Sequence, residues 1–124
     1  MLDHISLGVS DLAVSIAFYD AVLTALGYTR VWSDEDAAGY GYAGGDDNFA
    51  IKQEPAATVP AIRRLHVAFA APDRESVIKF YAAALAHGAV PDGPPELHPM
   101  YGEKYFAAFV GDPDGYRLEA VCHA

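Results

Sequence analysis

The sequence predicts an α+β fold made of two tandem βαβββ units. The first observation is an internal repeat, because residues 2–23 (LDHISLGVSDLAVSIAFYDAVL) recur without a gap as residues 64–85 (RLHVAFAAPDRESVIKFYAAAL). The second is that three further strand-like segments follow each copy. Since each repeat corresponds to one supersecondary unit, we expect two curved mixed sheets that pack around a common cleft.

The predicted boundaries divide one domain of 124 residues into unit one (1–54), a short linker (55–63) with proline at both ends of Pro55–Pro60, and unit two (64–124). This length suits a single compact domain. Because 52% of the residues are hydrophobic, the chain can form a packed core.

Unit one begins with a segment of alternating polarity at residues 2–9, which predicts a half-buried strand. Ser10-Asp11 is a helix-start signal, and Gly27 is a stop signal. Between them one apolar stripe recurs every three or four residues and predicts an amphipathic helix: Leu12, Ile16, Tyr19, Leu23 and Leu26. Three strands are expected next, at residues 28–33, 39–43 and 49–54.

Unit two repeats this order. A strand is expected at residues 64–70, and Pro72-Asp73 starts a helix that ends at Gly88. Its predicted buried stripe is Ile78, Tyr81 and Leu85. The remaining strands are expected at residues 89–97, interrupted by Gly93-Pro94-Pro95, and then at 105–110 and 116–121.

Charge and composition exclude several classes of partner. The formal net charge of −9 argues against nucleic-acid phosphates and anionic membrane surfaces. The single cysteine, Cys122, fits a reducing compartment. No signal peptide or bilayer-length apolar run is present, so we expect a soluble cytoplasmic protein that binds a small molecule.

Three polar residues stand out as candidate metal ligands. His4 and His66 occupy the same position in the first strand of each unit, and Glu119 lies in the last strand of unit two. If the concave faces of the two units meet, both imidazoles point into one cleft. Two neutral imidazoles and one carboxylate suit Fe(II), Mn(II), Zn(II) or Ni(II), with open positions for a substrate. His4, His66 and Glu119 are therefore the expected ligands of a divalent metal ion.

With His in each first strand and Glu in the last, the repeated unit resembles the vicinal oxygen chelate superfamily, which contains glyoxalases, bleomycin resistance proteins and extradiol dioxygenases. The resemblance rests on residues 2–23, on RLHVAFAAPDRESVIKFY and on FVGDPDGYRLEAV. It covers nearly the whole chain, and it implies that His4, His66 and Glu119 match three ligand positions of the family. It also implies a homodimer.

The fourth ligand position departs from the family pattern. Aligning the two final hairpins at an offset of 67 places Lys52 opposite Glu119, where glyoxalase I usually has Glu, Gln or His. A protonated lysine cannot be a ligand. Either the site has three protein ligands, which we favour, or a shift of register brings in Glu54. In the first case Lys52 would pair with Glu119 or bind an anionic substrate group.

Further residues are candidates for catalysis or substrate binding. His98, Tyr101 and Tyr105 belong to or flank the irregular segment Glu96–Lys104, which could close over a substrate. Arg117 shares a strand face with Glu119 and could bind a carboxylate. Trp32 and Tyr42 could line an aromatic pocket, although core packing is the alternative for each. The expected catalytic groups are Glu119, Lys52 and His98.

The leading hypothesis is a glyoxalase-like, metal-dependent enzyme that binds two neighbouring oxygens of a small substrate, as a lyase, isomerase or transferase. A metal-free binding protein of the bleomycin-resistance type is the second hypothesis, and an Fe(II) ring-cleaving dioxygenase is the third. The sequence predicts a homodimer whose units pair either within a chain or across two chains. In the second case His4 comes from one subunit and His66 with Glu119 from the other.

Overall fold

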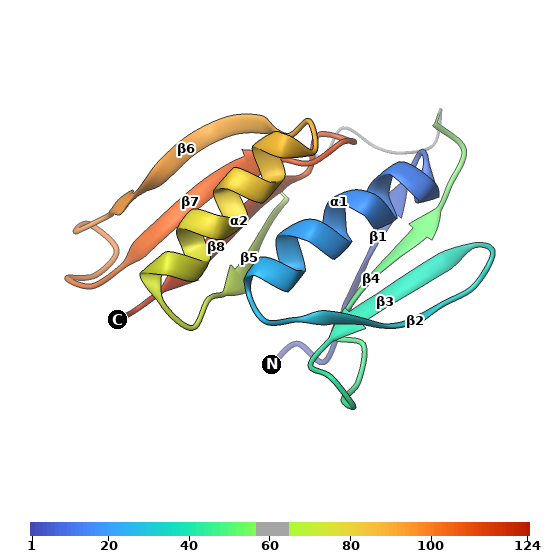
Figure 1. Ribbon diagram of the computed structural model, residues 1–124, viewed down its shortest axis with the longest axis horizontal. Coiled ribbons are helices and arrows are strands. Elements are labelled where there is room, and N and C mark those ends of the chain that lie inside the picture. The colour runs from blue at the N-terminus through green and yellow to red at the C-terminus, as the bar shows by residue number, and fades with distance from the viewer. Residues whose placement is uncertain (57–64) are drawn as a thin grey trace.

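The structure, a computed structural model, describes residues 1–56 and 65–124. It confirms the α+β prediction, because two βαβββ units follow one another (Figure 1). Most of the predicted linker, and Arg64 at the expected start of unit two, lie outside the described residues.

Each unit is one helix and one four-stranded mixed sheet. Unit one consists of β1 (Ile5–Val9), α1 (Leu12–Ala25), β2 (Thr29–Ser33), β3 (Ala37–Gly41) and β4 (Phe49–Gln53), with strand order β1-β4-β3-β2. Unit two consists of β5 (His66–Ala70), α2 (Arg74–Ala86), β6 (Val90–Leu97), β7 (Phe106–Gly111) and β8 (Arg117–Cys122), with order β5-β8-β7-β6. In both units the first strand runs parallel to the last.

Figure 1 shows α1 and α2 side by side, with one sheet behind each helix. One hydrophobic core extends through both units, and it contains Leu7 and Val9 of β1 as well as Leu118 and Ala120 of β8. These residues alternate with Ser6, Arg117 and Glu119, whose side chains are on the opposite face of each sheet. We call that opposite face the concave face.

The helices begin where the sequence predicts. The carboxylate of Asp11 accepts a hydrogen bond from the backbone N–H of Val14, and Asp73 accepts one from Ser76 in the same way. The predicted stripe of α1 is confirmed, with Ile16 only partly buried. The predicted stripe of α2 is wrong, since Ile78 and Leu85 are exposed. Its buried face is one residue earlier and consists of Val77, Phe80 and Ala84.

The edge strand β6 runs through the predicted interruption at Gly93-Pro94-Pro95. Its pairing with β7 shifts register twice, between Pro91 and Gly93 and between Gly93 and Glu96. Because proline cannot donate to a ladder, an edge strand with bulges is where the fold tolerates this composition.

The turn at residues 112–116 fastens unit two to unit one. The Tyr19 hydroxyl donates to Asp112 Oδ2 at 2.5 Å, and the Tyr116 hydroxyl donates to the carbonyl of Gly8 at 2.7 Å. Ser10 Oγ donates to Asp114 Oδ1 at 2.5 Å. Burial raises the pKa of Asp112 in spite of the hydrogen bonds that it accepts. The turn that sequence reasoning treated as a hairpin signal therefore also joins the units within one chain.

Neither helix within the described part of the chain is long and apolar enough to span a bilayer.

Candidate active site

His66 and Glu119 form the centre of the candidate site, on the concave face of unit two. Strands β5 and β8 pair in parallel with Ala68 opposite Glu119, so the two side chains project from neighbouring strands on one face. His66 Nε2 lies 2.8 Å from Glu119 Oε1. The Glu119 side chain is 3% exposed and that of His66 is 34% exposed, which leaves the imidazole as the accessible partner.

Tyr105 holds the second carboxylate oxygen. Its hydroxyl donates a short hydrogen bond to Glu119 Oε2. Burial, followed by the contact with Glu119, raises the pKa of Tyr105 to about 12, so the hydroxyl remains a donor at neutral pH. Each oxygen of Glu119 is thereby in contact with one neighbour, Oε2 with the Tyr105 hydroxyl and Oε1 with His66 Nε2, and these contacts orient the carboxylate.

Aromatic rings surround this pair. The Phe109 ring packs edge-on against His66, with centroids 5.8 Å apart, and against His98 at 5.4 Å. The His98 ring stacks on Tyr101 at 6.0 Å. His98 Nε2 is buried and has no hydrogen-bond partner within residues 1–56 and 65–124. Because a buried polar atom is costly to leave unpaired, this nitrogen is a candidate contact for a bound molecule.

Arg117 is on the same face, where the sequence places it. Its guanidinium carbon lies 4.7 Å from the centroid of the Phe109 ring, and its Nε donates to Asp92 Oδ2 at 2.8 Å. The cation is therefore held by a ring and a carboxylate, and it remains about half exposed.

His4 is not brought to this pair. It precedes β1, its side chain is 65% exposed, and its Nδ1 lies 2.7 Å from Asp3 Oδ1. In the part of the chain that the structure describes, no three His, Cys, Asp or Glu side chains are close enough together to hold a metal ion. In one chain, therefore, His66 and Glu119 lie together and the third predicted ligand, His4, does not join them.

The ladders correct the predicted fourth position. Ser6 and Ala68 correspond in the two repeats, as the helix caps Asp11 and Asp73 do. Ser6 pairs with Ala50, whereas Ala68 pairs with Glu119. The residue of unit one that corresponds to Glu119 is therefore Ala50, whose methyl group cannot be a ligand.

The ladder therefore places neither Lys52 nor Glu54 opposite the unit-one counterpart of Ala68. Lys52 pairs with Gly8 instead, and in one chain the Glu119 carboxylate is bonded to His66 and Tyr105 rather than to Lys52. Glu54 lies beyond the end of β4 and is exposed. Binding of an anionic substrate group by Lys52 remains a prediction.

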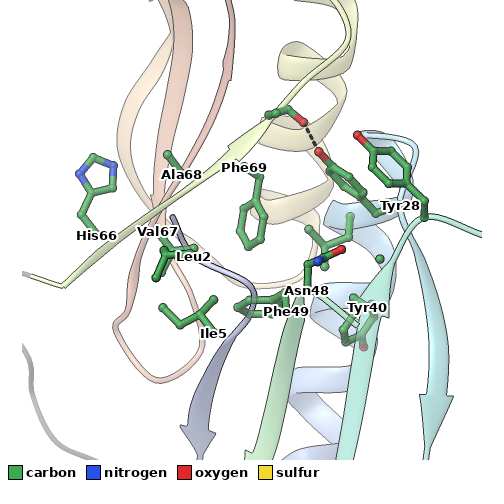
Figure 2. Close-up of a pocket in the computed structure, with 14 residues that line it drawn as sticks. Leu2, Ile5, Tyr28, Tyr40, Asn48, Phe49, His66, Val67, Ala68 and Phe69 are labelled. Carbon is green, nitrogen blue, oxygen red and sulfur yellow. Dashed lines mark hydrogen bonds between the residues drawn. The ribbon is translucent and has the colours of Figure 1, made fainter. Parts of the chain in front are cut away.

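Two other predicted residues lie elsewhere. Trp32 covers Gly39 of the neighbouring strand, where a Cβ atom would lie 2.2 Å from Trp32 Nε1. Tyr42 packs against Tyr28, with ring centroids 5.1 Å apart, and lines a cavity at the boundary of the two units (Figure 2). Neither belongs to the His66–Glu119 cluster in a single chain.

Sequence reasoning named Tyr105 as a candidate substrate contact but missed its bond to Glu119, which gives it a positioning role. Contact of Tyr105 with a substrate remains a prediction. His123 was assigned no role, yet its ring packs edge-on against Tyr105 at 5.2 Å. Both flank strands of unit two, where alternation no longer predicts which face a side chain occupies.

The donor set partly fits a divalent metal. An imidazole and a carboxylate on one concave face are suitable ligand types, and Tyr105 provides the outer hydrogen bond that such ligands usually have. A third donor must come from outside the described part of one chain, or from a rearrangement of the residues before β1.

The sequence profile of the glyoxalase/bleomycin resistance protein/dioxygenase superfamily matches residues 1–120. The chain belongs to this superfamily. It is similar to the crystal structure of a glyoxalase/bleomycin resistance protein from Albidiferax ferrireducens T118, with 30% identity, a TM-score of 0.80, and coverage of 96% of this chain and 95% of that one. No curated protein matches the sequence significantly.

Two further structures share the superfamily fold at lower identity. A glyoxalase/bleomycin resistance protein/dioxygenase family enzyme from Burkholderia phytofirmans PsJN has a TM-score of 0.74 at 17% identity, with 97% and 96% of the chains covered. A glyoxalase-related enzyme from Fulvimarina pelagi has a TM-score of 0.69 at 21% identity, with 98% and 86% covered. The superfamily assignment confirms the resemblance inferred from the repeated His and the final Glu.

Proposed function

We propose that this superfamily member is a glyoxalase-like enzyme that depends on a divalent metal ion and whose site is completed across a homodimer. The observation that carries the proposal is the 2.8 Å pair of His66 and Glu119, two ligand types held together on the concave face. His4 of a second copy would supply the third donor, which gives a set of two imidazoles and one carboxylate. Zn(II), Ni(II), Mn(II) and Fe(II) all accept such a set.

Exchange between subunits is supported by the way in which one chain is assembled. Contacts from Tyr19 and Ser10 to the turn at residues 112–116 fix unit one against unit two. In that arrangement His4 is turned toward Asp3 and exposed to solvent. A two-fold dimer is the commonest assembly of identical chains, and it would create two equivalent sites.

When bound, the metal would supply Lewis acidity to two neighbouring oxygens of a small substrate. The chain's own residues would orient the ligands and contact the substrate. Tyr105 keeps the Glu119 carboxylate in one orientation, and the buried His98 Nε2 is available to a substrate atom. Phe109 and Tyr101 contribute aromatic rings beside His98. Lys52 and Arg117 are the cations that could hold an anionic group of the substrate.

The test is metal titration of the purified protein after chelator treatment. We expect about one Zn(II) or Mn(II) per chain by calorimetry, and His66→Ala and Glu119→Gln should each weaken binding by orders of magnitude. His87→Ala is the matched control, because His87 caps the far end of α2. Equal affinity in His66→Ala and in the control would disprove the site.

A metal-free binding protein of the bleomycin-resistance type is the second candidate. It is favoured by one observation, that both oxygens of Glu119 are already in contact with protein groups. A chain that takes up none of the four metals would support this function. A ring-cleaving dioxygenase would use the same ligands with Fe(II), and oxygen consumption with a catechol would identify it.

A further inference from the structure

A cavity of about 390 Å³ lies between unit one and strand β5. Figure 2 shows the rings of Phe49 and Phe69 next to each other, while the imidazole of His66 points away. Unit one contributes core-facing residues here, such as Ile5 and Tyr40, rather than the concave face. His66 is one of the residues that line the cavity, so the cavity adjoins the His66–Glu119 pair, but Glu119 does not line it.

The walls are apolar and carry no fixed charge. Phe49 and Phe69 meet edge-on with ring centroids 5.1 Å apart, and Leu23 and Val67 extend the surface. None of the 14 lining residues is Asp, Glu, Lys or Arg. In a protein whose net charge is −9, such a lining favours a neutral ligand.

Polar atoms are placed at one side of this apolar space. The Tyr28 hydroxyl donates to the carbonyl of Ala70 at 2.7 Å, a bond drawn in Figure 2. Burial, followed by the neighbouring Tyr42, raises the pKa of Tyr28 to about 12, so this donor stays protonated. Tyr42 is 64% exposed and lies against Tyr28, which makes it accessible to an entering ring.

The backbone of β5 offers a second polar feature. This strand is at the edge of its sheet, next to β8. The backbone N–H of Ala71, just after β5, donates a hydrogen bond to the carbonyl of Val121 in β8. In a parallel ladder, alternate residues point both backbone groups to the same side. Ala71 and Phe69 therefore face β8, and the N–H and C=O of Ala68 face the open edge beside the cavity.

We propose that this cavity is a second small-molecule site, which binds a neutral planar aromatic ligand carrying a hydroxyl or amide group. The ring packs between Phe69 and Tyr42, and the polar group pairs with the open backbone edge at Ala68. Volume and lining agree with ordinary ligand pockets, which are mostly apolar with few polar groups. The site does not depend on a metal.

The test uses 2-naphthol as the probe, with binding followed by its fluorescence. We expect about one molecule per chain, unaffected by chelator. Tyr42→Ala should weaken binding about tenfold, because a ring contact is lost. Tyr101→Ala is the matched control, since Tyr101 is similarly exposed at 66% but lies beside His98 on the concave face. The anionic 2-naphthalenesulfonate should bind more weakly than 2-naphthol.

Three outcomes would overturn the inference: no saturable binding, equal binding by Tyr42→Ala and wild type, or loss of binding in Tyr101→Ala. The last would place the probe on the concave face. A protein dimer that covers the cavity would give the first outcome. Binding of 2-naphthol and binding of metal are measured separately on the same protein, so failure here is distinguishable from failure of the proposed function.

Discussion

Tyr105 and His66 hold opposite oxygens of the same buried carboxylate, that of Glu119. His66 Nε2 would have to give up its contact with Oε1 to bind a metal, whereas the Tyr105 bond to Oε2 can persist. Tyr105 is therefore the group that keeps Glu119 oriented in both states.

The first prediction concerns this bond. Tyr105→Phe removes the donor but keeps the ring, and it should weaken Zn(II) binding by about 10-fold to 100-fold. Calorimetric titration measures the change, and Tyr101→Phe serves as control because Tyr101 has no bond to Glu119. Unchanged affinity in Tyr105→Phe, beside a wild type that binds metal, would assign Tyr105 to packing alone.

The second prediction concerns the contact between units. Tyr19→Phe leaves Asp112 Oδ2 without its hydroxyl donor in a buried position, which should lower the free energy of unfolding by about 1–3 kcal/mol. Denaturant unfolding measures it. The repeat counterpart Tyr81 is only partly buried, so Tyr81→Phe should have a smaller effect. Equal effects of the two substitutions would contradict a stabilising role of the Tyr19–Asp112 bond.

The third prediction tests the buried face of α2. Phe80 is fully buried and Ile78 is 51% exposed. Phe80→Ala should therefore cost about 3–5 kcal/mol of unfolding free energy, whereas Ile78→Ala should cost about 0.5 kcal/mol. The stripe expected from the sequence would require the reverse order, which thermal or denaturant unfolding would detect.

The fourth prediction concerns pH and the cap of α2. Hydrogen bonds from the backbone N–H and the hydroxyl of Ser76 lower the pKa of Asp73 below its ordinary value of 3.8. The contribution of this charge is thus fully present above 3.8, and it is lost as the pH falls through the lower pKa of the folded state. Asp73→Asn keeps an acceptor without the charge. Its melting temperature should lie below that of wild type at neutral pH, and the gap should narrow in acid. A gap that is constant with pH would contradict this.

Period-two alternation was sufficient to predict that Glu119 shares a face with Arg117 and that His66 faces away from the core. It could not locate the fourth position, because the two hairpins differ in length. The connection between β3 and β4 spans residues 42–48, whereas that between β7 and β8 spans residues 112–116. Applying one sequence offset to both hairpins therefore assigned Lys52 to the position that strand pairing gives to Ala50.

The buried face of α2 was missed for a different reason. Two stripes of this helix are comparably apolar in sequence, one through Phe80 and one through Tyr81, and only packing against the sheet decides between them. The bond from Tyr105 to Glu119 likewise depends on where the segment after β6 returns to the sheet, which no local pattern specifies.

The central claim is that one metal site takes His4 from one chain and His66 with Glu119 from another. Mixing His4→Ala chains with Glu119→Ala chains, after unfolding and refolding together, tests it most directly through the Mn(II) or Zn(II) bound per dimer. We predict that each variant alone binds none, and that mixed dimers regain one intact site. Absence of any regained site, in mixtures that sedimentation shows to be dimeric, would contradict the exchanged site.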